Sequence, residues 1–243
     1  MSVHRTCLAA MIAAVMSVSA ISASAVRAEP VSFDLVLMGL TAGRLTYDGS
    51  INGGSYAVSG RLQTTGLAAL LKQVRYDATA KGRVAKGVFT PEAYTEDANT
   101  GKRQSRSVMG YRRGVPQVTQ YQPARAPRST DVDPATQGGT VDPLTALFAT
   151  LADVAPGQEC RTKLRLFDGR RASQLTTGGR KQSGDKVTCT GEYRRVAGFS
   201  ADEMADRVSF PFTLTYSPQP GGTMRVTEVA MQTIYGRGRL VRR

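Results

Sequence analysis

Histidine is almost absent from this sequence and tryptophan is absent altogether: His4 is the only histidine among 243 residues. Histidine is the usual general base near neutral pH and the commonest metal ligand in proteins. His4 also lies in an N-terminal segment that we expect to be removed. The remaining chain therefore cannot form a Ser-His-Asp or Cys-His catalytic site or a zinc site with histidine ligands. We expect no metal and no cofactor; only carboxylate, lysine or tyrosine chemistry stays open.

Long apolar runs are lacking as well. The longest, residues 8–21 (LAAMIAAVMSVSAI), has about 14 residues, fewer than the roughly 20 that a membrane-spanning helix needs. Basic residues precede it and the small residues of SASAVRA follow it, which is the three-part pattern of a secretory signal peptide. We expect cleavage after Ala28, with Ala25 as the alternative. The prediction is a signal peptide over residues 1–28 and a single β-rich domain over residues 29–243, soluble and either periplasmic or secreted.

Cysteine is scarce. Of three cysteines, Cys7 lies within the expected signal peptide, which leaves Cys160 and Cys189. Two cysteines cannot form an all-thiolate zinc site, because such a site needs four. Two cysteines in an exported chain are typical of a disulfide. We predict a disulfide between Cys160 and Cys189, with a pair of buried reduced thiols as the alternative.

The pattern around these cysteines raises a geometric problem. Alternation in residues 160–167 and 186–193 places both cysteines on the apolar side of their strands. The Asp-Gly pair at 168–169 predicts a hairpin. In a simple meander, a third strand over 171–178 would therefore hold the two cysteine strands about 9.6 Å apart, whereas a disulfide spans at most about 7 Å between Cα atoms. Either Cys160 precedes its strand, or the strands do not form a meander, or the thiols are free.

Acidic residues are few relative to basic ones. The sequence has 19 Asp and Glu against 32 Lys and Arg, and only two of the basic residues lie in the expected signal peptide. Such a balance is typical of proteins with an anionic partner, such as lipid headgroups, lipopolysaccharide, an acidic polymer or nucleic acid, and also of basic exported proteins without such a partner. We favour the second interpretation, with a contact to a membrane surface next. The charge forms no compact run, and we expect no nucleic acid. The candidate contacts with an anionic surface are Arg161, Lys163, Arg165, Arg170 and Arg171.

Alternation of apolar and polar residues dominates the rest of the sequence. In VSFDLVL, for example, Val31, Phe33 and Leu35 share one face, and this period of two recurs in about ten to twelve segments. Residues 122–140 contain three prolines and no periodicity, which predicts a long surface loop. The sequence predicts a mainly β fold, either a large curved antiparallel sheet or an open barrel, with one or two short helices.

Two apolar segments break the alternation. In TTGLAALLKQ (residues 64–73) we expect a short helix or turn that plugs the end of a barrel, with a membrane contact as the alternative. In VDPLTALFATL (residues 141–151), Asp142 is placed to cap a helix that has Pro143 at its first position. The apolar stripe of this second helix predicts packing on the sheet.

Clusters of carboxylates have structural explanations. Asp131 and Asp133 lie in the Pro-rich loop, where such pairs form turns more often than metal sites; calcium would need six or more oxygen ligands. Ser200 and Glu203 have the spacing of a capping box at the start of a helical turn. We therefore expect these carboxylates to stabilise turns and a helix end.

Several motifs together resemble a known family. They are MGLTAGRLTYDGSINGGSYAVSGRLQTTGL, KGVFTPEAY, VDPLTAL, LRLFDGRRASQL, VTCTGEYRRVAGF and YGRGRL, which span nearly all of the chain after residue 28. Their order resembles the exported bacterial proteins of the family labelled domain of unknown function 3108. The resemblance implies an exported β-rich domain and carries over no catalytic residues. At the level of the fold, the chain is similar to the half-open β-barrels of periplasmic lipoprotein carriers, which hold acyl chains.

These observations predict a non-enzymatic periplasmic protein of the cell envelope that binds a lipid, or another hydrophobic ligand or partner, in the concavity of its sheet. A first alternative is a structural or interaction module that contacts anionic envelope surfaces, such as a membrane, through a basic face. A second alternative is a glycan-active enzyme, which would need two carboxylates roughly 5–10 Å apart in a cleft.

Overall fold

The computed structural model describes residues 30–233 and 236–243, and most of this part of the chain is β-strand. Its strands are β1 Val31–Leu37, β2 Leu40–Asn52, β3 Ser55–Thr64, β4 Arg75–Ala85, β5 Val88–Asn99, β6 Gln104–Arg112, β7 Val115–Gln122, β8 Lys163–Phe167, β9 Ala172–Ser183, β10 Lys186–Ala197, β11 Ser209–Pro218, β12 Met224–Thr233 and β13 Gly236–Arg242. Its helices are α1 Gly66–Leu71, α2 Pro143–Leu151 and α3 Ala201–Asp206, with a 3-10 turn η1 at Pro134–Thr136.

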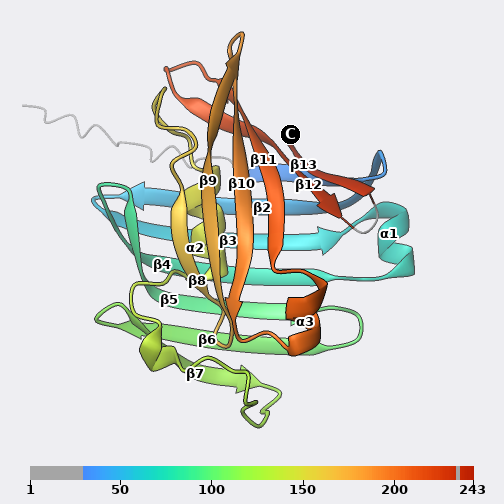
Figure 1. Cartoon of the computed structure of the whole chain (residues 1–243), viewed down its shortest axis with the longest axis vertical. Coiled ribbons are helices and arrows are strands. Elements are labelled where there is room, and N and C mark those ends of the chain that lie inside the picture. Colours follow the sequence, from blue (N-terminus) through green and yellow to red (C-terminus); the bar gives the residue numbers. More distant parts are fainter. Residues whose placement is uncertain (1–29, 234–235) are drawn as a thin grey trace, which may run out of the picture.

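All of these strands belong to one antiparallel sheet, in the order β7-β6-β5-β4-β3-β2-β1-β13-β12-β11-β10-β9-β8. The first and last strands pair at its centre, and β7 and β8 form its two edges, so the sheet is not closed. In Figure 1 the first half of the sheet, β1–β7, runs across the view, and strands of the second half, β8–β13, run upright in front of it. The prediction of a large curved antiparallel sheet is confirmed.

Helix α2 lies between the two halves of the sheet (Figure 1). Its side chains Leu144, Phe148 and Leu151 belong to a core cluster that contains inward-facing side chains from both halves. Two glycines allow α2 to approach the first half closely. A Cβ at Gly49 would lie 2.6 Å from the Phe148 ring, and a Cβ at Gly60 would lie 2.9 Å from Leu144. The predicted packing of this helix on the sheet is confirmed, and the helix fills the interior.

Both ends of α2 are fastened. Asp142 caps the helix and Pro143 is at its start, as predicted. The residue before the cap, Val141, forms a parallel bridge with Leu166 of β8. Beyond the other end, the chain after α2 and the start of β12 exchange two backbone hydrogen bonds of 2.9 and 2.7 Å, between Val154 and Met224. These contacts hold the helix from both sides.

Helix α1 does not plug a barrel end, so that expectation is wrong. It lies in the link from β3 to β4, where the Thr65 backbone N–H donates to the Ala42 carbonyl of β2 at 3.1 Å. Leu67, Leu70 and Leu71 are 74%, 83% and 90% exposed. The physical reason is that α2 already fills the interior. No helix in residues 30–233 and 236–243 is long and apolar enough to cross a membrane.

A disulfide joins Cys160 and Cys189, as predicted, and its Cα atoms are 5.2 Å apart. Strands β8, β9 and β10 do form a simple meander. However, β8 begins only at Lys163, so Cys160 lies in the lead-in and is not held at the spacing of two strands. The first of the three explanations is therefore correct. The bond is consistent with an oxidising compartment.

The Pro-rich loop is held by its own polar groups. Asp131 accepts a hydrogen bond from the Arg128 backbone N–H at 2.8 Å and pairs with the Arg125 guanidinium at 2.7 Å. Asp133 caps η1 by accepting from the Ala135 backbone N–H at 2.9 Å. The expected turn-forming role of both carboxylates is confirmed.

Candidate functional site

The concave side of the sheet, where we expected a lipid, is occupied by protein. Phe148 of α2 packs against Tyr47, Tyr56 and Phe89 of the first half, with ring centroids 6.2, 6.3 and 6.0 Å apart. An acyl chain could take this place only if α2 left it. The surfaces open to a partner are therefore the outer faces of the sheet and the ends of its strands.

A buried chain of hydrogen bonds lies at the start of α2. The Thr145 hydroxyl donates to the Asp142 carboxylate at 2.6 Å, and the Tyr56 hydroxyl lies 2.8 Å from the same Thr145 oxygen. Because Asp142 is fully buried, its pKa is raised to about 6 despite the hydrogen bonds from Thr145. The hydroxyl of Tyr111 is also buried and has no hydrogen-bond partner in the described part of the chain. The chain of hydrogen bonds positions α2 and is closed to the surface.

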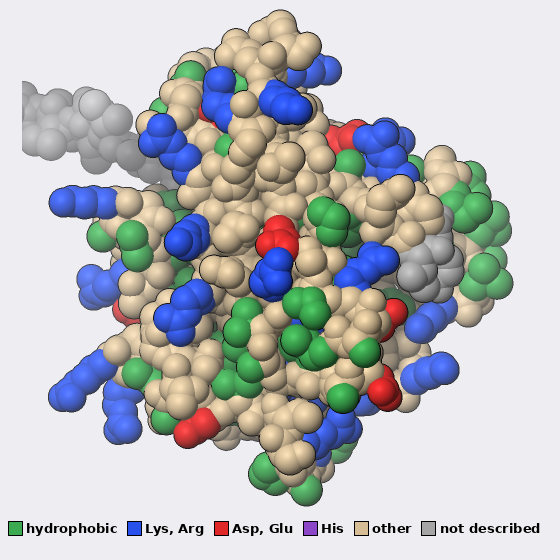
Figure 2. Space-filling model, viewed as in Figure 1, with side chains coloured by type: hydrophobic (Ala, Val, Ile, Leu, Met, Phe, Trp, Pro, Cys, Tyr) green, Lys and Arg blue, Asp and Glu red, His purple; other side chains and the backbone are tan. Residues whose placement is uncertain are grey.

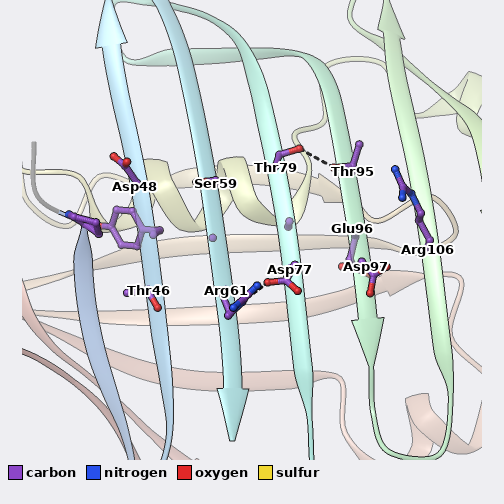
Figure 3. A pocket seen from close by; sticks show the side chains of 14 residues that line it. Thr46, Asp48, Ser59, Arg61, Asp77, Thr79, Thr95, Glu96, Asp97 and Arg106 are labelled. Carbon is purple, nitrogen blue, oxygen red and sulfur yellow. Dashed lines mark hydrogen bonds and ion pairs between the residues drawn. The ribbon is translucent and has the colours of Figure 1, made fainter. Parts of the chain in front are cut away.

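A shallow hollow of about 580 Å³ crosses the outer face of strands β2 to β6. Figure 3 shows it from outside, with α2 and the second half of the sheet behind the strands. Small side chains such as Ser59, Thr79 and Thr95 form its floor, and the hydroxyls of Thr79 and Thr95 are 2.6 Å apart. Its lining consists of Pro30, Thr46, Tyr47, Asp48, Ser59, Gly60, Arg61, Asp77, Ala78, Thr79, Thr95, Glu96, Asp97 and Arg106.

Charged side chains at this hollow form an ion-pair ladder across strands β3, β4 and β5. Arg61 of β3 pairs with Asp77 of β4 at 2.5 Å. Arg75 of β4 contacts Asp77 as well and reaches Asp97 of β5 at 2.9 Å. Arg106 of β6 is directly opposite Asp97 in the sheet (Figure 3). Each carboxylate of the ladder therefore has a guanidinium partner, and exposed pairs of this kind contribute little to stability.

A glycan-active site would need a protonated carboxyl beside a second carboxylate in one cleft. Burial raises the pKa of Glu96, but this side chain faces the interior, where the buried Tyr94 hydroxyl donates to it at 2.8 Å. Asp97, the next residue in the strand, faces the outside, because successive side chains of a strand alternate. The sheet therefore separates these two carboxyls, and the geometry does not support glycan hydrolysis here.

The basic residues suggested by the sequence do not form one group. Arg161, Lys163 and Arg165 are exposed, on the outer face of β8 and its lead-in. The alternation that predicted a solvated basic face is therefore confirmed for these three residues.

The other two suggested residues have partners within the protein. Arg170 lies over the ring of Tyr121, 5.5 Å from its centroid. Arg171 pairs with Glu203 of α3 at 3.0 Å, and Glu203 also completes the predicted capping box with Ser200. Arg170 and Arg171 therefore contact other parts of the fold, whereas the three exposed basic residues of β8 and its lead-in face the solvent.

One end of the strands exposes a cluster of apolar side chains, which we call the apolar end: Met38, Leu40, Leu67, Leu70 and Leu71. Met38 and Leu40, at the turn from β1 to β2, are 76% and 69% exposed, and the other three are the leucines of α1. Figure 2 shows hydrophobic side chains gathered over α1 at the right-hand edge. Together they expose an area on the order of several hundred Å², which marks interaction sites on soluble proteins. In the sequence, the spacing of Leu67, Leu70 and Leu71 at i, i+3 and i+4 indicates that the three leucines share one face of a helix.

Cationic side chains border the apolar end. Lys72 follows α1 directly, and Lys102 and Arg103 lie in the turn from β5 to β6; all three are exposed. The turn lies against the link after α1, since a Cβ at Gly101 would be 3.0 Å from the Gln73 carbonyl oxygen. Neither α1 nor this turn contains an acidic residue. Apolar and cationic groups are thus combined at one end of the molecule.

Comparison with known proteins identifies the family. The profile of the family described as "Protein of unknown function (DUF3108)" matches residues 31–225. The chain belongs to this family. The DUF3108 match runs from β1 into β12, so it includes α1, α2 and both cysteines of the disulfide, and it confirms the resemblance seen in the sequence.

A similar solved structure is the crystal structure of a β-barrel-like protein of the domain of unknown function DUF1849 from Brucella abortus. It is 13% identical, and the alignment covers 88% of this chain and 94% of that chain with a TM-score of 0.45. No curated protein matches the chain.

Proposed function

We propose that this protein is a non-enzymatic component of the cell envelope, exported to the periplasm, that attaches to an anionic membrane surface through its apolar end. The exposure of Leu67, Leu70 and Leu71 on one face of α1 carries the proposal. Clustered apolar side chains in water are unfavourable, and burial in lipid removes that cost. The cations beside them complement a negatively charged surface.

The expected strength is that of a reversible peripheral contact. Full burial of a leucine contributes about 1.5–3 kcal/mol, and we take roughly half of this for insertion at an interface, which gives on the order of 3–4 kcal/mol for the three leucines of α1. Each Lys or Arg close to an anionic surface adds about 1 kcal/mol, so Lys72, Lys102 and Arg103 add on the order of 3 kcal/mol. The combination of both kinds of group favours anionic bilayers over neutral ones.

The non-enzymatic part of the proposal rests on the chemistry that is available. The described residues contain no histidine, and the two carboxylates of the ion-pair ladder, Asp77 and Asp97, are paired with arginines. The disulfide and the expected signal peptide favour an exported location. A hydrophobic ligand in the concavity has weaker support, because α2 fills that space.

A second candidate surface is the exposed basic face of β8, with Arg161, Lys163 and Arg165. Such a face would bind an anionic membrane by electrostatics alone, and its binding would decrease steeply with salt. Binding through the apolar end should instead retain a component that does not depend on salt.

Co-sedimentation with vesicles of anionic and neutral lipids tests the proposal on the chain without residues 1–28. Leu70→Ser combined with Leu71→Ser should weaken binding to anionic vesicles roughly 30-fold, which corresponds to about 2 kcal/mol. The matched control is Val88→Ser, because Val88 is 66% exposed but is the first residue of β5, after the turn from β4, at the opposite end of the strands.

Wild-type binding by the double leucine variant would refute attachment through the apolar end. Replacing Arg161, Lys163 and Arg165 by glutamine separates the second candidate. If that variant alone loses binding, the basic face of β8 is the contact.

A further inference from the structure

A small polar hollow of about 280 Å³ lies directly beside the apolar end. One wall is Gln73, in the link that follows α1, and the other is the turn from β5 to β6. The lining residues are Gln73, Asn99, Gly101, Lys102, Arg103 and Gln104. The hollow therefore begins two residues after Leu71, the last leucine of the apolar end.

The lining offers mostly hydrogen-bond donors and no acid. Lys102 brings an ammonium group and Arg103 a guanidinium, while Gln73 and Gln104 bring amide N–H groups. The side-chain oxygen of Asn99 already accepts from the Gly101 backbone N–H at 2.9 Å. A group with several acceptor oxygens and negative charge would be complementary to this lining.

Arg103 is partly anchored in a way that leaves donors available. One of its terminal nitrogens, Nη2, contacts the hydroxyls of Ser105 and Tyr121 at 3.2 and 3.3 Å. These contacts position the guanidinium, and both hydroxyl partners are uncharged. The Glu96 carboxyl also interacts with Arg103 electrostatically. The remaining N–H groups of its planar fork can serve an oxyanion.

Hydrogen bonds fix both walls of the hollow. In the turn, the Thr100 backbone N–H and hydroxyl donate to the Arg103 carbonyl at 2.9 and 3.3 Å. On the other side, the Thr64 hydroxyl donates to the Lys72 carbonyl and accepts from the Val74 backbone N–H, both at 3.0 Å. The donors are thus presented by a preformed frame.

We propose that this hollow binds the phosphate group of a lipid whose acyl chains lie along the leucines of α1. This proposal rests on the proposed attachment to a membrane, and it specifies the lipid headgroup that the protein would prefer there. A phosphate monoester carries more charge and has more free oxygens than the phosphodiester of an ordinary headgroup, so Lys102 and Arg103 select it. The lipid class is therefore one with a terminal phosphate.

Vesicle binding at matched surface charge tests this preference. One set of vesicles contains phosphatidic acid and the other phosphatidylserine, with fractions adjusted to equal zeta potential. The wild-type chain should bind the phosphatidic acid vesicles about tenfold more tightly. Lys102→Gln combined with Arg103→Gln should abolish the preference and leave residual binding to both sets. The matched control, Arg112→Gln with Arg113→Gln, changes two exposed basic residues at the end of β6 and in the turn to β7 and should keep the preference.

Equal binding of the wild type to both sets, or a preference that survives in the Lys102 and Arg103 variant, would overturn the assignment. Inorganic phosphate alone is the second probe: if it binds to the wild type while neither set of vesicles is preferred, the hollow is a site for the free ion and not for a lipid. The leucine variant of the apolar end keeps the two proposals apart. If it binds both sets as the wild type does and the preference still depends on Lys102 and Arg103, the phosphate site stands and insertion of the leucines fails.

Discussion

The stability of the protein should depend on the ionisation of Asp142, which caps α2 inside the sheet. Burial raises the pKa of this carboxyl from 3.8 to about 6, so the folded protein binds this proton more tightly than the unfolded chain does. The difference of roughly 2.2 corresponds to about 3 kcal/mol at 1.36 kcal/mol per pKa unit. Because the pKa of Asp142 is higher in the folded protein than in the unfolded chain, the protonated carboxyl stabilises the fold. This contribution to the free energy of unfolding is fully present below about pH 3.8 and is lost as the pH rises to about 6.

Asp142→Asn should remove this dependence and keep the cap, because asparagine is a strong N-cap residue. The asparagine oxygen can accept from the Thr145 backbone N–H, and its amide can donate to the Thr145 hydroxyl, which can then donate to Tyr56. Urea unfolding of the oxidised protein between about pH 4.5 and 8 measures the free energy of unfolding of both proteins. The difference between them should change by about 2 kcal/mol over this range, in favour of the variant at high pH.

Comparison with the variant cancels the contribution of other carboxyls, including Glu96, whose pKa burial also raises. Parallel pH profiles for wild type and variant would refute the reasoning. They would mean that the pKa of Asp142 is the same in the folded protein as in the unfolded chain.

Two further predictions concern the packing of α2 and the disulfide. Gly60→Ala should lower the melting temperature and reduce the free energy of unfolding by about 1–3 kcal/mol, because its methyl group would lie 2.9 Å from Leu144. Adding Leu144→Ala to this variant should recover part of the loss. The control Gly178→Ala should leave the stability unchanged, because its Cβ would have nothing within 4 Å. Replacing Cys160 and Cys189 by serine opens a loop with a sequence separation of 29. The free energy of unfolding, measured in urea, should fall by about 3–4 kcal/mol. An unchanged urea midpoint would show that the bond does not constrain the unfolded chain.

The strands, the cap of α2 and the disulfide could be predicted because each depends on neighbouring residues. Alternation in VSFDLVL places Phe33 inside, and it is fully buried. The Asp142-Pro143 pair starts a helix by local hydrogen bonding and backbone geometry. The disulfide follows from the number of cysteines and the expected compartment, although its route through the lead-in before β8 does not.

The choice between the two apolar helices could not be predicted from their own residues. Both α1 and α2 are short and rich in leucine, and we expected α1 to enter a barrel end. The close fit of α2 depends on Gly49 and Gly60, which admit Phe148 and Leu144 and lie more than eighty residues earlier in the sequence. A local pattern contains no information about such a distant fit.

For the candidate site, a membrane contact of residues 64–73 was only an alternative prediction from the sequence, and the cations beside them were not predicted, for a similar reason. The leucines of α1 and the cations of the turn from β5 to β6 come together only because β4 pairs with β5 along their length, from Arg75 opposite Asn99 to Ala85 opposite Val88. The basic residues that the sequence singled out, by contrast, were neighbours in the sequence. Three of them lie on one exposed face of β8 and its lead-in, while Arg170 contacts Tyr121 and Arg171 pairs with Glu203.

The pairing of β1 with β13 has a consequence for folding. It places Leu35 opposite Leu240, so the seam at the centre of the sheet joins residues roughly two hundred positions apart, a separation that slows folding. Until the last strand arrives, β1 presents an unpaired edge with free backbone donors and acceptors, which is a template for pairing with other chains. Before β1 and β13 pair, this edge is therefore open to aggregation. A chaperone that shields β1 during that interval would cover an edge that the finished fold conceals.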